Sequence, residues 1–113
     1  NEENVKNYIE DPLCGFTFTV NGFQTLFQLI WNLHDRKKLQ EMPQRLPVLF
    51  ISGEEDPVGD YGKSVLRVYQ SFKEAGMENV QMKLYPEDRH ELLNEEDRQE
   101  VYADVYRWLL QRI

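Results

Sequence analysis

The chain has 113 residues and a mass of 13.5 kDa, with 20 acidic against 13 basic side chains, so its net charge is −7 at pH 7. That length allows one domain with one modest hydrophobic core. The acidic balance disfavours nucleic acid and anionic membrane surfaces as partners, because both bind clustered positive charge and the only dense basic run is Arg36-Lys37-Lys38.

Cysteine content and hydropathy indicate the cellular compartment in which the protein is expected. The single cysteine, Cys14, cannot form an internal disulfide, which favours a reducing cytoplasm. No apolar run reaches the ~18 residues of a membrane-spanning helix, and the first residues lack the basic and apolar regions of a signal peptide. We therefore predict a cytoplasmic location and no integral membrane segment. The chain begins at Asn1 rather than at a methionine, so we expect it to come from a longer protein.

The N-terminal third carries one clear helical signal. Before it, Asp11–Gly15 has the composition of a turn, and Phe16–Val20 alternates apolar and polar residues as a short extended segment does. Asn21 is a good N-cap residue and is followed by apolar side chains at helical spacing, which predicts a helix from about residue 22 to residue 39. The basic run lies in its last turn, where cations oppose the helix dipole.

The rest of the chain alternates strands and helices. A continuous apolar run at Val48–Ile51 predicts a strand buried on both faces. Apolar positions at helical spacing predict a helix over residues 62–75 with Gly76 as its C-terminal cap, and Val80–Tyr85 predicts a second strand. A last helix is predicted from Asn94 to the chain end, with three acidic side chains in its first turn.

This order of elements is a βαβα unit, whose crossover connection makes the two strands parallel. The predicted fold class is therefore α/β. Two strands form an incomplete sheet, because parallel strands need both faces and both edges covered.

Two loops carry the candidate catalytic side chains. One, Ser52–Asp60, follows the first strand, and the other, Pro86–Glu91, follows the second. Because the carboxyl ends of parallel strands meet at one edge of a sheet, Asp56 of the first loop and His90 of the second are within reach of a hydrogen bond. A carboxylate that accepts from one imidazole nitrogen leaves the other nitrogen as a base, which is the orienting half of a catalytic triad.

Spacing alone leaves other interpretations open. In one of them Asp56 is a solvated acid and His90 is a surface histidine paired with Glu87, Asp88 or Glu91. The His-Glu pair also begins a zinc-protease motif, but the position that needs a second histidine holds asparagine. Calcium binding is disfavoured because a proline interrupts the acidic loop and the distal glutamate of a calcium loop is missing.

Three segments resemble a known family. Leu46–Gly59 (LPVLFISGEEDPVG) resembles the acid loop of α/β-hydrolase-fold enzymes, especially the lysophospholipase and monoacylglycerol-lipase-like branch related to serine aminopeptidases. Arg89–Glu95 (RHELLNE) resembles the histidine loop of that branch, and Asp11–Phe16 (DPLCGF) is similar to its return from the cap. The match covers nearly the whole chain with its spacing intact.

The resemblance implies a domain organisation. Residues 1–113 are one partial domain, the C-terminal part of an α/β hydrolase with the last two parallel strands of its sheet. Within it, residues 1–20 are the segment that returns from the cap, and residues 21–113 are a helix followed by the βαβα unit. No metal or organic cofactor is implied.

The resemblance also implies that Asp56 is the triad acid and His90 the triad base. In this fold the nucleophilic serine precedes both, on a Gly-x-Ser-x-Gly elbow. Ser52 and Ser71 lack both flanking glycines of this elbow, and Ser64 has Gly62 before it but Leu66 where the second glycine is needed. The single cysteine has proline where the first glycine is needed. We therefore expect the nucleophile and the oxyanion donors to lie upstream of this chain, and the chain alone to be inactive.

The parent protein is then expected to be a serine hydrolase of carboxylic esters, with small lipid-like esters such as monoacylglycerols or lysophospholipids as leading substrates. The alternative is a non-catalytic binding or oligomerisation module with degenerate triad loops. In the family's sheet the strand at Val48–Ile51 has an upstream neighbour, so we expect a bare strand edge here and a homo-oligomer joined through it. Phe16, Phe18 and Phe23 are better explained by core packing than by an acyl pocket.

Overall fold

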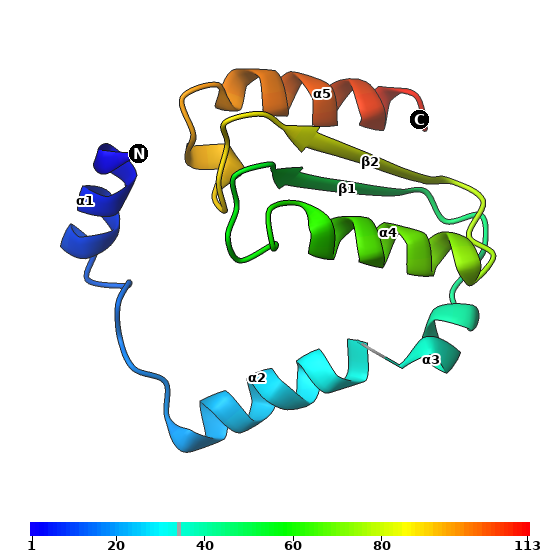
Figure 1. The fold of residues 1–113 in the computed structure, drawn as a ribbon, viewed down its shortest axis with the longest axis horizontal. Helices are drawn as coiled ribbons and strands as arrows, with labels where there is room; N and C mark the ends of the chain where they lie inside the picture. The colour runs from blue at the N-terminus through cyan, green and yellow to red at the C-terminus, as the bar shows by residue number, and fades with distance from the viewer. Residues whose placement is uncertain (34) are drawn as a thin grey trace.

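The computed structural model describes residues 1–33 and 35–113 (Figure 1). Its elements are α1 (Glu2–Glu10), α2 (Val20–Leu33), α3 (Arg36–Gln40), β1 (Val48–Gly53), α4 (Lys63–Glu74), β2 (Val80–Tyr85), the single-turn 3-10 helix η1 (Leu92–Asn94) and α5 (Arg98–Leu110).

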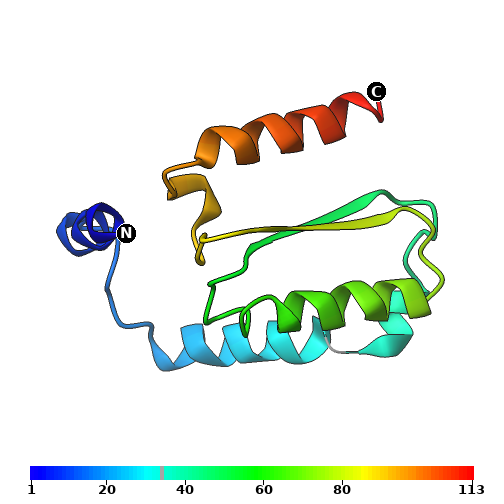
Figure 2. The same ribbon diagram turned by 45° about the horizontal axis from the view of Figure 1, so that its top comes forward.

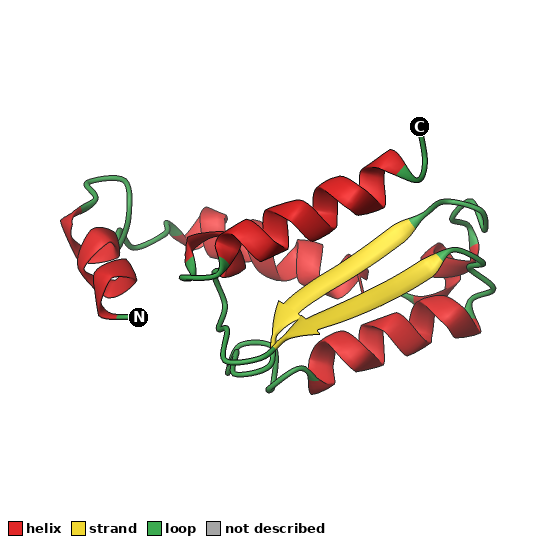
Figure 3. Ribbon diagram, turned by 90° about the horizontal axis from the view of Figure 1, so that it is seen from above, coloured by secondary structure: helices red, strands yellow, loops and turns green. Residues whose placement is uncertain are grey.

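Three layers form the centre of the molecule. β1 and β2 run parallel and in register (Figure 3), so that Gly53 lies beside Tyr85 at their carboxyl ends. α4 covers one face of this strand pair and α5 covers the other, while α1 and α2 lie outside the layers (Figures 1 and 2). The predicted α/β class and parallel pairing are thus confirmed. Tyr85, Leu92 and Val101 form a buried hydrophobic cluster, with Ile51 packed against it, and Met77 and Val80 are also buried.

α4 and β2 form where the sequence predicts them. Gly62 and Gly76 flank α4 with φ of 78° and 94°, backbone conformations that favour glycine, and this is why the helix begins and ends there. The rings of Phe50 on β1 and Phe72 on α4 meet edge to face, 5.0 Å apart, and join the helix to the sheet.

A polar network joins β2 to α5 on the opposite face. The ammonium group of Lys83 pairs with Asp104 and with Glu100, and the Tyr85 hydroxyl donates to Asp104 at 3.0 Å. Burial and the Asp104 carboxylate raise the pKa of Tyr85 to about 12, so the phenol stays protonated and keeps donating. These bonds fix the entry and the direction of α5 relative to the end of β2.

Burial of β1 differs from the prediction. Residues 48–51 are half-buried rather than buried on both faces, and only Ser52 and Gly53 are buried. The sheet has two strands within the described residues, so one edge of β1 has no neighbouring strand. The strand also extends two residues beyond Ile51, and these residues lead into the acid loop.

The predicted helix over residues 22–39 is wrong in its start and in its length. α2 begins at Val20 because Thr19, not Asn21, caps it: the Thr19 hydroxyl oxygen accepts the Gly22 N–H at 3.1 Å. Near the other end, Asp35 accepts the Lys37 N–H at 3.0 Å and starts α3 as a separate helix. The basic run therefore belongs to the short α3.

The last helix starts later than predicted. η1 occupies Leu92–Asn94, and α5 begins only at Arg98. Glu95 leaves the helical path because its carboxylate accepts the Arg89 N–H at 3.3 Å instead of lying in a first helical turn. The three acids therefore form a turn between the histidine loop and α5.

The N-terminal segment contains α1, which the sequence did not predict, followed by the expected turn, in which the Cys14 N–H donates to the Asp11 carbonyl at 3.0 Å. Residues 16–19 form no strand. Phe16, Phe18 and Phe23 contact one another edge to face but stay 64%, 48% and 40% exposed, so the core-packing interpretation is wrong for them within this chain.

Gly53 is predicted to be intolerant of any side chain. A Cβ at this position would overlap the main-chain carbon and oxygen of Asp88, so Gly53→Ala must push the two loops apart. We expect a loss of about 1–3 kcal/mol in the free energy of unfolding, measured by urea denaturation.

Gly22→Ala on α2 is the control for that measurement. A Cβ there meets the exposed side chain of Phe18 at 3.3 Å and the Thr19 hydroxyl at an ordinary contact distance of 3.4 Å, and alanine restores helix propensity, so stability should stay within about 1 kcal/mol. Equal stabilities of Gly53→Ala and the wild type would show that the loops do not touch as described.

Candidate active site

The acid loop and the histidine loop leave the sheet at the same edge. β1 ends at Gly53 and β2 at Tyr85, and these two residues are paired. Beyond them, the Glu54 N–H donates to the Tyr85 carbonyl and the Glu55 N–H donates to the Asp88 carbonyl, both at 2.9 Å. The backbones of the two loops are therefore bonded to each other before either reaches its candidate catalytic residue.

Asp56 is a buried carboxylate with its oxygens engaged. Oδ1 accepts the Val58 N–H at 2.8 Å, and Oδ2 lies 3.0 Å from Nδ1 of His90. Burial alone would raise the pKa of Asp56, but the hydrogen bonds from His90, Val58 and Gly59 outweigh it and hold this pKa below its usual value. Asp56 is thus ionised at neutral pH and accepts from His90.

His90 is held on one side and open on the other. Its side chain is 62% exposed, whereas that of Asp56 is 6% exposed. Because the ionised carboxylate accepts, Nδ1 carries the proton, and Nε2 is left with its lone pair. This arrangement suits an imidazole that takes a proton from an incoming hydroxyl.

The structure brings Asp56 and His90 together, as their loops predicted. The alternative partners of His90 are engaged elsewhere: Glu91 accepts from the side-chain amide of Asn94 at 2.7 Å, and the Asp88 carboxyl is buried near Asp97. Glu87 stands at a left-handed turn with φ of 64°. A histidine paired with one of these three acids is therefore not what the structure contains.

The three serines of the chain form hydrogen bonds with groups other than His90. Ser52 is buried, and its hydroxyl donates to the carbonyl of Gly53 at 3.4 Å. The Ser64 hydroxyl accepts from Arg67, and the Ser71 hydroxyl donates to the Arg67 carbonyl at 2.9 Å. None of them is bonded to His90 in the structure as described.

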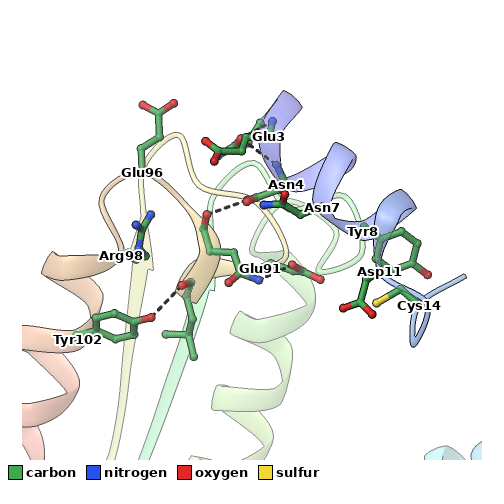
Figure 4. A pocket seen from close by; sticks show the side chains of 13 residues that line it. Glu3, Asn4, Asn7, Tyr8, Asp11, Cys14, Glu91, Glu96, Arg98 and Tyr102 are labelled. Atoms are coloured by element: carbon green, nitrogen blue, oxygen red, sulfur yellow. Dashed lines mark hydrogen bonds between the residues drawn. The ribbon is translucent and has the colours of Figure 1, made fainter.

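Cavities lie between the N-terminal segment and the histidine loop. One, of about 550 Å³, is lined mostly by polar side chains, and the Asn4 amide bridges it by donating to the Asn94 carbonyl at 2.9 Å (Figure 4). Another, of about 250 Å³, has His90 in its wall together with Val5 and Tyr8 of α1. α1 therefore borders the open side of His90.

Cys14 and the acidic residues give no sign of a metal centre. Burial, followed by the charges of Asp11 and Glu91, raises the pKa of the Cys14 thiol and keeps it protonated. In residues 1–33 and 35–113, no group of three or more His, Cys, Asp or Glu side chains is arranged to hold a metal ion. Across the same residues, no helix is long and apolar enough to cross a bilayer.

Sequence reasoning missed three residues that build this site. Gly53 permits the close approach of the loops, Asp88 supplies the carbonyl that joins them, and Glu95 accepts the Arg89 N–H beside His90. Composition marks this segment as a solvated turn, yet Asp88 and Glu95 are only 4% and 6% exposed. Burying an acid is costly, and this cost indicates a structural role that the sequence does not reveal.

A family model described as "Serine aminopeptidase, S33" matches residues 1–97. The chain therefore belongs to this family of α/β hydrolases. No curated protein matches it.

Among solved structures, the chain is similar to a highly thermostable carboxyl esterase from Bacillus coagulans, determined in complex with glycerol. The TM-score is 0.83 and the sequence identity 27%, over 98% of this chain and 36% of the esterase. The chain thus spans little more than a third of the length of that esterase and has part of the α/β-hydrolase fold.

Asp88 predicts a pH dependence of stability. Burial first, and then the Asp97 carboxyl and the charges of Glu95 and Glu100, raise the pKa of Asp88 from 3.8 to about 6. A carboxyl whose pKa is higher in the folded state stabilises the fold at low pH, and that contribution is lost as the pH rises from 3.8 to about 6.

Asp88→Asn removes this ionisation. We expect it to raise the free energy of unfolding by on the order of 2–3 kcal/mol at about pH 8 and to change it far less at about pH 4, as read from urea denaturation at both pH values. Glu87→Gln, at the exposed neighbouring position, should leave the pH profile unchanged. A pH profile of Asp88→Asn that parallels that of the wild type would contradict the assignment.

Proposed function

We propose that the chain is the C-terminal, acid-and-histidine portion of a cytoplasmic serine hydrolase that cleaves carboxylic esters. The observation that carries the proposal is the 3.0 Å contact between Asp56 Oδ2 and His90 Nδ1 at the carboxyl edge of a parallel strand pair. Membership of the serine aminopeptidase family and similarity to a carboxyl esterase support the ester-hydrolase chemistry. The leading substrates are lipid-like esters such as monoacylglycerols or lysophospholipids.

The proposed mechanism assigns one role to each residue. A serine hydroxyl from upstream sequence attacks the ester carbonyl while His90 Nε2 accepts its proton, and Asp56 stabilises the imidazolium that forms. His90 then donates that proton to the leaving alcohol, which leaves an acyl-enzyme. Water deprotonated by His90 hydrolyses the acyl-enzyme and regenerates the serine.

Substitution in the protein that carries both this chain and the upstream serine tests the roles. We expect Asp56→Asn to lower kcat for a 4-nitrophenyl ester by about 10⁴-fold, because the imidazole loses its orientation and tautomer. His90→Ala should lose activity to a similar or greater extent. KM should change little in both variants, since neither residue is assigned to ground-state binding.

Asp60→Asn is the matched control on the acid loop. Among the described residues the Asp60 carboxylate pairs with Arg67 on the surface, at 3.2 Å, so its loss should change kcat less than about twofold. Full activity of Asp56→Asn or His90→Ala would contradict the proposed mechanism. Equally, an esterase rate in the isolated 113-residue chain that disappears in His90→Ala would contradict the upstream position of the nucleophile.

A second candidate function is that of an oligomerisation module. It is favoured by the edge of β1 that has no neighbouring strand within the described residues and by the half-exposed apolar side chains of residues 48–51. The occupant we propose is β1 of a second copy, added strand to strand.

Light scattering on the isolated chain tests this self-association. We expect the mass of a dimer or a larger assembly, because an unpaired apolar strand edge recruits another strand. A monomeric mass at high protein concentration would contradict it.

A further inference from the structure

Glu95 is a buried acid without a cationic partner. It is 6% exposed, in the turn between η1 and α5. Among the described residues no ion pair reaches its carboxylate, and the nearby Arg98 guanidinium donates to the Glu95 main-chain carbonyl at 3.2 Å instead. Burying an unpaired carboxylate is costly unless hydrogen-bond donors offset the lost hydration, so the donor that reaches this carboxylate matters to the local structure.

That contact is with the backbone of the histidine loop. Oε1 of Glu95 accepts the N–H of Arg89 at 3.3 Å, and Arg89 directly precedes His90. This N–H belongs to the Asp88–Arg89 peptide, and the carbonyl at the other end of the same peptide plane accepts the Glu55 N–H at 2.9 Å. Glu55 in turn directly precedes Asp56.

One peptide plane is therefore held at both ends. Its N–H end belongs to Arg89, next to His90, and its carbonyl end is bonded to Glu55, next to Asp56. A peptide group is rigid, so rotating it to release one end also releases the other. If the Arg89 N–H lost its acceptor, the plane would be free to turn, and both the Glu55 bond and the backbone position of His90 would change.

We propose that Glu95 is the positioning residue of the histidine loop: its carboxylate holds the Asp88–Arg89 peptide in the orientation that places His90 Nδ1 against Asp56. This inference rests on the proposed function only in treating His90 as the base. The contact itself is a property of the chain and is testable without catalysis.

Glu95→Met separates positioning from mere structural support. Methionine fills a similar volume, cannot accept a hydrogen bond and removes the buried charge, so stability should be kept or improved. The imidazole tautomer of His90 is then the readout, from ¹⁵N chemical shifts in mildly alkaline solution, where a histidine ring is uncharged. The chain has two histidines, and His34→Gln assigns the remaining signals to His90.

The expected result has three parts. The wild type shows His90 with its proton mainly on Nδ1, Glu95→Met shifts the population toward the Nε2–H tautomer that free histidine prefers, and Glu95→Gln retains Nδ1–H because its amide oxygen accepts from Arg89. Glu96→Met, at the exposed neighbouring glutamate, leaves the tautomer unchanged. An unchanged Nδ1–H tautomer in a folded Glu95→Met overturns the proposal.

Amide hydrogen exchange keeps the proposal falsifiable if Glu95→Met fails to fold. In the wild type the Arg89 amide should exchange slowly, and in Glu95→Gln it should remain protected. Rapid exchange of this amide in the folded wild type overturns the assignment. The esterase assay of Asp56→Asn and His90→Ala tests the proposed function. The two spectroscopic results test the role of Glu95 alone.

Discussion

The Asp88–Arg89 peptide is the contact on which the arrangement of both loops depends. It lies directly against Gly53, where a side chain would overlap it, and its carbonyl accepts the N–H of Glu55. Parallel pairing of β1 and β2 brings the loops to one edge, but pairing alone leaves each loop free beyond its strand. This peptide extends the order of the sheet by several residues, as far as Asp56 and His90.

Two buried carboxylates in this region have opposite electrostatic environments. Asp56 accepts hydrogen bonds from His90 and from backbone N–H groups, which lower its pKa despite burial. Asp88 faces Asp97 and other acids, which add to the effect of burial and raise its pKa to about 6. Burial is therefore not what distinguishes them; the donors are. The loop geometry gives the donors to Asp56, so it is the acid that remains charged and orients the imidazole.

The sequence predicted the elements whose signals are local. β2 and α4 form as expected because an apolar run and a helical repeat are bounded by breakers, including glycines at positive φ. The helix predicted from residue 22 was misplaced because Thr19 competes with Asn21 as its cap. The last helix was misplaced because the Glu95 side chain turns back to the Arg89 N–H, six residues earlier in the chain. Asp56 and His90 were predictable as neighbours from topology. The role of Gly53 depends on a contact between two loops, and that of Glu95 on a side-chain bond to the backbone within the histidine loop, and no residue pattern encodes either contact.

We propose that this chain supplies the acid and the histidine to a serine hydrolase whose nucleophile lies elsewhere in the protein. Fluorophosphonate labelling of an extract from the native source tests it, with an antibody raised against residues 1–113 used to isolate and size the band. We expect a labelled band well above 13.5 kDa. An unlabelled band near 13.5 kDa would show that the chain exists without a reactive serine and would contradict the claim.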